Sequence, residues 1–116
     1  MDLKIRTKNF ALSIINLYSA LPKSTVAQVL GKQILRSGTS VGAHYREAIR
    51  ARSNAEFISK IEGGLQELEE TAYWLELFAE FKESNVDEVN RIYSETDELI
   101  SILVACAKNA KNWNRK

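Results

Sequence analysis

The sequence of 116 residues contains one proline, five glycines and one cysteine. Because proline and glycine interrupt regular elements, their scarcity predicts long, uninterrupted ones. The single cysteine, Cys106, cannot form a disulfide within the chain, which indicates a reducing, cytoplasmic location. The sequence has neither a cleavable signal nor an apolar stretch long enough to span a bilayer, so we expect no membrane association.

Residues that catalysis and metal binding require are also scarce. His44 is the only histidine, which excludes a di-metal site built from two Glu-x-x-His motifs. Glu67 and Glu70 share one face of an expected helix but have no histidine beside them. Cys106 lies within a helical apolar pattern and is interpreted as a small core residue. We therefore expect no enzymatic activity, no metal site and no cofactor.

The stretch "RSGTSVGAHYREAIRAR", residues 36–52, resembles a phosphate-binding loop only in its glycines. Such a loop follows a strand and carries Lys-Ser or Lys-Thr after its last glycine. The Gly-Lys pair nearest to this stretch, Gly31-Lys32, is instead followed by Gln33, and no strand is expected before any of the glycines. The glycines instead follow helical spacing, at Gly31, Gly38 and Gly42. Each costs about 1 kcal/mol relative to alanine inside a helix, and the close approach of another helix would offset that cost.

Apolar residues repeat with helical periodicity along nearly the whole chain. Pro22 ends a first helix over about 7–20, and the pairs Thr25/Gln28 and Ser53/Glu56 are typical of capping boxes that open the second and third helices. The second helix should run to about Ala51, with the side chains of Val26, Leu30, Ile34, Val41 and Ala48 inside. A short polar stretch, "KESNVD", precedes a fourth helix centred on Leu103. The sequence predicts one all-α domain over 1–116, an antiparallel up-down-up-down four-helix bundle.

The second and third helices each carry another apolar stripe beside the core stripe. Two interpretations stay open: these stripes face neighbouring helices of the same bundle, with Gly42 opposite Gly63 and Gly64, or they form a subunit interface, where aromatic residues are enriched. The residues expected at an oligomer interface are Gly38, Gly42, Tyr45, Trp74, Leu77 and Phe81.

Charge is distributed unevenly along the chain. Residues 1–58 contain nine Lys and Arg against three Asp and Glu, and residues 59–116 contain seven against twelve. On a helical wheel Lys32, Arg36, Arg46 and Arg50 fall on the side opposite the core, with no acidic residue between them. This row, which we call the basic stripe, predicts binding to the phosphate backbone of RNA or DNA. The alternative is a protein–protein interaction module whose basic stripe contacts acidic protein surfaces.

The stretches "LPKS", residues 21–24, and "QILRSGTSVGAHYREAIRARSNAEFISKIEGGLQELEETAYWLEL", residues 33–77, resemble bacterial four-helix-bundle proteins related to those encoded in intervening sequences of 23S ribosomal RNA genes. The close match covers roughly Leu21 to Leu77. The resemblance implies a homopentamer without established enzymatic activity. It extends to the accessory variability protein of diversity-generating retroelements, a basic pentameric barrel that binds nucleic acid and a reverse transcriptase. By this resemblance we expect a cytoplasmic homo-oligomeric scaffold or adaptor, with RNA or DNA and a reverse transcriptase or other protein as its partners.

Overall fold

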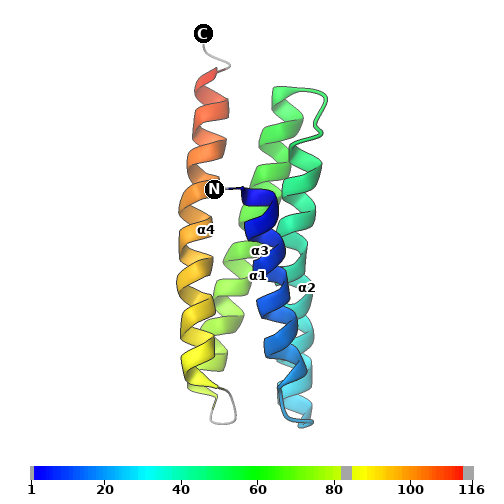
Figure 1. Cartoon of the computed structure of the whole chain (residues 1–116), viewed down its shortest axis with the longest axis vertical. Helices are drawn as coiled ribbons and strands as arrows, with labels where there is room; N and C mark the ends of the chain where they lie inside the picture. The colour runs from blue at the N-terminus through cyan, green and yellow to red at the C-terminus, as the bar shows by residue number, and fades with distance from the viewer. Residues whose placement is uncertain (1, 82–84, 114–116) are drawn as a thin grey trace.

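The computed structural model describes residues 2–81 and 85–113, which form four α-helices. Successive helices run in opposite directions, so the chain makes the predicted up-down-up-down bundle (Figure 1). The bundle is elongated, with extents of 52 × 22 × 20 Å. Its helices are α1 (Leu3–Ser19), α2 (Thr25–Ala48), α3 (Asn54–Glu80) and α4 (Val86–Trp113). The all-α, four-helix prediction is confirmed. Residues 82–84 of the expected polar turn lie outside the described part of the chain.

Side chains just before the first three helices satisfy backbone N–H groups that have no partner inside the helix. Asp2 accepts a hydrogen bond from Lys4 N–H at 2.9 Å, so α1 begins at Leu3, four residues earlier than predicted. Ser24, and not Thr25, caps α2, because its hydroxyl accepts from the backbone N–H of Ala27. Of the capping box predicted at the start of α3, the hydrogen bond to the Ser53 side chain is confirmed. The Ser53 hydroxyl accepts from Glu56 N–H at 3.1 Å.

One apolar stripe from each helix meets along the bundle axis. Ile34 and Val41 of α2 are fully buried as predicted, and so is Leu103 of α4. The prediction for Val26 was wrong: its side chain is 53% exposed, and Ala27 takes the inward position in this first turn of α2. The largest fully buried side chains are Phe78, Ile14, Leu17, Ile34, Ile61, Leu68, Leu75, Leu99 and Leu103.

Glycines of α2 bring α1 close to its backbone. A Cβ placed on Gly38 would lie 2.6 Å from Cγ1 of Ile14, and one on Gly42 would lie 3.2 Å from Oγ1 of Thr7. The predicted close approach of a helix is therefore real, but the approaching helix is α1. The expected pairing of Gly42 with Gly63 and Gly64 was wrong.

Helix α1 is shorter than its neighbours, with 17 residues against 24 to 28 in the others. Its first turn lies beside the last turns of α2, below the connection that joins α2 to α3 (Figure 1). Contact between α1 and α4 is narrow, and Arg6 reaches across it to Glu95 at 2.6 Å and Glu98 at 3.1 Å. Because the first turn of α1 lies beside the last turns of α2, the outer sides of these two segments are adjacent and open to solvent.

Candidate functional site

The structure places the whole basic stripe on one open face of α2. Lys32, Arg36 and Arg46 are exposed side chains of the helix, and Arg50 follows its C-terminal cap. Within residues 2–81 and 85–113, no carboxylate comes within ion-pair distance of any of these four cations. Their charges are thus available to an external anion.

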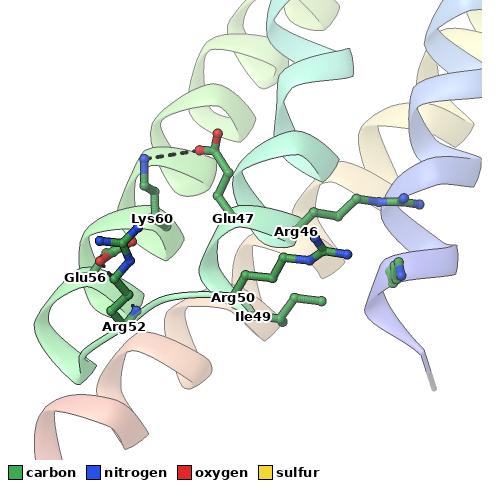
Figure 2. A pocket seen from close by; sticks show the side chains of 8 residues that line it. Arg46, Glu47, Ile49, Arg50, Arg52, Glu56 and Lys60 are labelled. Carbon is green, nitrogen blue, oxygen red and sulfur yellow. Dashed lines mark hydrogen bonds and ion pairs between the residues drawn. The ribbon is translucent and has the colours of Figure 1, made fainter.

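The one acidic residue of α2 is turned away from the basic stripe. The Glu47 carboxylate forms an ion pair with Lys60 of α3, with Nζ and Oε1 3.2 Å apart (Figure 2). Thr39, which lies between Arg36 and Arg46 in the sequence, donates its hydroxyl to the backbone carbonyl of Leu35 at 2.7 Å. The surface between the cations therefore offers little competing negative charge.

The last turn of α2, the connection to α3, the first turns of α3 and the first turn of α1 line an open hollow of about 540 Å³. Figure 2 shows Arg46 and Arg50 extending from α2 in the same direction, with Ile49 beside them. Ile49 is 47% exposed and supplies an apolar wall. The residues that line this hollow are Lys4, Arg46, Glu47, Ile49, Arg50, Arg52, Glu56 and Lys60.

Sequence reasoning found two cations of this hollow, Arg46 and Arg50, and missed Lys4, Arg52 and Lys60. Lys4 is more than 40 positions away from α2's last turn, and only the antiparallel packing of α1 brings it there. A charge count along the first half of the chain signals an excess of cations, but it does not show which of them converge.

The six residues predicted at a subunit interface do not share one environment. Gly38 and Gly42 are buried against α1 within the chain, so for these two the intramolecular interpretation holds. Tyr45 is half-buried near Cys106, and burial raises the pKa of its phenol. On α3, Trp74, Leu77 and Phe81 are half-buried.

An aromatic contact marks the outer face of α3. The rings of Tyr73 and Trp74 lie 5.1 Å apart, and Tyr73 is 54% exposed. The indole N–H of Trp74 has no hydrogen-bond acceptor among the described atoms. Surface aromatic residues of this kind are common in protein–protein contacts.

His44 packs over Gly63 of α3, where a Cβ would lie 2.9 Å from two ring atoms. Its Nδ1 is buried and has no hydrogen-bond partner within the described residues. No cluster of three or more His, Cys, Asp or Glu side chains suited to a metal ion occurs in the part of the chain that the structure describes. None of its four helices combines the length and apolarity needed to cross a membrane.

Fold and surface together define an antiparallel four-helix bundle with one exposed cationic face. Residues 1–105 match the family described as 23S rRNA-intervening sequence protein. The chain belongs to this family, as its resemblance over roughly Leu21 to Leu77 predicted.

A solved structure has the same fold over nearly its whole length. It is a crystal structure of a protein with unknown function from the S23 ribosomal protein family of Bacteroides thetaiotaomicron VPI-5482. The two chains share 39% sequence identity with a TM-score of 0.86, over 92% of this chain and 99% of the other. A comparison with curated proteins finds no match.

Proposed function

We propose that this protein is a non-enzymatic, homo-oligomeric scaffold that binds the phosphate backbone of RNA or DNA through its basic stripe. The observation that carries the proposal is the exposed row Lys32, Arg36, Arg46 and Arg50, which faces solvent with no carboxylate in ion-pair distance among the described residues. Cations without acidic neighbours attract polyanions, because binding releases the counterions condensed on the phosphates.

Little sequence preference is expected from this face. Phosphate contacts position a nucleic acid without reporting its bases, and stacking on bases requires aromatic side chains. No aromatic residue lies among the four cations on the outer face of α2. The ligand is therefore defined by its backbone, and shape or partner proteins would supply selectivity.

Assembly into a ring, a homopentamer as the family resemblance implies, would multiply a weak contact. Four cations on one subunit give modest affinity at physiological salt, whereas several linked copies raise the effective concentration of each contact. Of the residues predicted at the subunit interface, Tyr45, Trp74, Leu77 and Phe81 keep part of their surface exposed. The exposed ring of Tyr73 adds to the patch on α3.

The test is a salt titration of binding to fluorescent single-stranded and duplex RNA and DNA. Each lost phosphate contact should flatten the slope of log affinity against log salt by about 0.9 on duplex DNA and about 0.7 on a single strand. We expect weaker binding and a flatter slope when all four stripe residues are replaced: Lys32→Gln, Arg36→Gln, Arg46→Gln and Arg50→Gln.

A matched control removes the same charge elsewhere, with Lys23→Gln, Arg91→Gln, Lys108→Gln and Lys111→Gln, and should retain most of the affinity. If the wild-type protein binds no nucleic acid even at low salt, the proposal fails. That result would favour an interaction module whose basic stripe contacts acidic protein surfaces.

A further inference from the structure

The hollow at the end of the basic stripe differs from the stripe in how its charges are arranged. Along α2 the cations follow a line of about 27 Å, at 1.5 Å per residue. At the end of α2, cations arrive from three segments: Lys4 from α1, Arg46 and Arg50 from α2 and its cap, and Arg52 from the connection to α3. Figure 2 shows Arg46 and Arg50 extending together toward α1, while Arg52 lies on the α3 side of the hollow. The stripe therefore follows one helix, whereas the hollow is lined by cations from three segments.

Two carboxylates also line the hollow, and both are engaged. Glu47 pairs with Lys60 at 3.2 Å, and Glu56 accepts the backbone N–H of Arg52 at 3.5 Å at the start of α3. The side chains of Lys4, Arg46, Arg50 and Arg52 form no ion pair with any carboxylate in residues 2–81 or 85–113. Cationic charge therefore remains in excess in the hollow.

The terminal phosphate of a nucleic-acid strand suits such a site better than a phosphate inside the strand. A phosphomonoester carries a charge of about −1.5 to −2 at pH 7 and three acceptor oxygens, whereas a backbone phosphodiester carries one charge. Guanidinium groups bind such oxygens through paired N–H donors, and two of them that extend side by side, as Arg46 and Arg50 do, can share one terminal phosphate. The volume of about 540 Å³ also lies within the range of small-ligand pockets.

From this geometry we propose that the hollow binds the terminal phosphate of a nucleic-acid strand whose backbone follows the basic stripe. Arg46 and Arg50 belong to both the stripe and the hollow, so a strand along α2 leads its end into the hollow. The exposed Ile49 provides an apolar surface for the terminal sugar or base. This inference rests on the proposed function, and it states that the protein recognises the terminal phosphate of the strand as well as its backbone.

The test compares one oligonucleotide with a 5′-phosphate, with a 3′-phosphate and with neither, at a single salt concentration. We expect the wild-type protein to bind a phosphorylated strand about five- to tenfold more tightly than the unphosphorylated one, as one added charge-assisted contact would give. The two phosphorylated strands distinguish which end enters the hollow.

Two variants with equal charge loss separate the hollow from the stripe. Lys4→Gln with Arg52→Gln removes one lysine and one arginine from the hollow alone, and should bring the preference for phosphorylated strands close to one. Lys32→Gln with Arg36→Gln removes the same types from the stripe alone, and should weaken all strands while keeping the preference. All four side chains are exposed, so both variants should fold.

The outcomes distinguish this inference from the function on which it rests. If the wild-type protein binds all three strands equally, or if the hollow variant keeps the preference, the terminal-phosphate site is refuted while backbone binding stands. If the wild-type protein binds none of the strands, both the site and the proposed function are refuted.

Discussion

The hydroxyl oxygens of Ser37 and Thr71 lie 2.8 Å apart in the buried contact between α2 and α3. Thr71 also lies 2.8 Å from the carbonyl of Glu67 in its own helix, and it donates its only hydroxyl hydrogen there. Ser37 has two acceptors within reach, Thr71 at 2.8 Å and the carbonyl of Ile34 at 3.4 Å, and the shorter contact is the one between the helices. This bond fixes the register of α2 against α3 in a region otherwise filled by apolar side chains.

We expect Thr71→Val to lower the free energy of unfolding by about 1–3 kcal/mol, because the buried Ser37 hydroxyl loses its closer acceptor and keeps only the longer contact to the carbonyl of Ile34. Ser37→Ala together with Thr71→Val should cost less than the sum of the two single variants, since no hydroxyl is then left unpaired. Urea unfolding of the four proteins gives the coupling energy. Strict additivity would show that the two hydroxyls do not interact.

Gly38 and Gly64 should respond oppositely to alanine, although both are buried within helices. At Gly38 the new Cβ meets buried Ile14 at 2.6 Å, so we expect a loss of about 1–3 kcal/mol. At Gly64 the nearest atom is Cδ1 of Leu103, at an ordinary 3.5 Å, and the helix propensity of alanine should stabilise by up to about 1 kcal/mol. Thermal and urea unfolding measure both. Equal shifts of the same sign would contradict the close packing of α1 on α2.

Leu103 and Val104 are neighbours in α4 with opposite exposure, 1% and 48%. Leu103→Ala should cost about 2–5 kcal/mol, because it removes buried contacts and leaves a cavity. Val104→Ala should change stability by less than about 0.5 kcal/mol. Denaturant unfolding of the two variants tests the register of α4, and a loss well under 1 kcal/mol for Leu103→Ala would contradict it.

Alkaline pH should destabilise the end of the bundle where Tyr45 lies near Cys106. Burial raises the pKa of the Cys106 thiol above its ordinary 9.0, and burial followed by the nearby Cys106 and Asp2 raises the pKa of Tyr45 above 10.0. The unfolded chain thus loses these protons first, so their contribution to stability is complete below about pH 8 and declines from about pH 9 upward. Urea unfolding across this range should show a smaller decline for Tyr45→Phe with Cys106→Ala. An unchanged decline in that variant would assign the effect to other groups.

Light scattering should report a mass several times 13.1 kDa, and five times that value if the family resemblance extends to the pentamer. Trp74→Glu with Phe81→Glu should give smaller species, because charge replaces apolar contact area. Tyr73→Glu alters the same face at an exposed position and should weaken assembly without disturbing the core. A monomeric wild-type protein at micromolar concentration would exclude the homo-oligomer.

The sequence predicts all four helices because each carries a long run of apolar residues at helical spacing. Their starts are less exact, since α1 begins four residues earlier than expected and Ser24 replaces Thr25 as the cap of α2. The Ser53 cap and the buried positions Ile34, Val41 and Leu103 follow from spacing alone. The helix that packs on Gly38 could not be identified from the sequence, because glycine spacing predicts that a helix approaches this face of α2 closely but not which helix it is. In a bundle α2 packs against two other helices, and the spacing of its glycines does not distinguish between them.

The candidate site shows the same division. Three of the four stripe residues lie on α2 and Arg50 lies just after its C-terminal cap, so a helical wheel groups them on the open face. Lys4 and Arg52 enter the hollow from other segments, and their positions depend on the length of α1 and the path of the connection after α2. Tertiary packing brings these residues of different segments to one hollow, and local sequence periodicity carries no information about it.

The uneven charge of the two halves of the chain has a consequence for how the molecule approaches a ligand. The cation-rich residues 1–58 build α1 and α2, and the acid-rich residues 59–116 build most of α3 and α4, so positive and negative charge lie on opposite hairpins of a body about 20 Å thick. A single chain therefore carries an electric dipole across the bundle, perpendicular to its long axis. The field of a polyanion exerts a torque on this dipole and turns α2 toward the polyanion before contact, which raises the rate of productive encounters and makes that rate sensitive to salt.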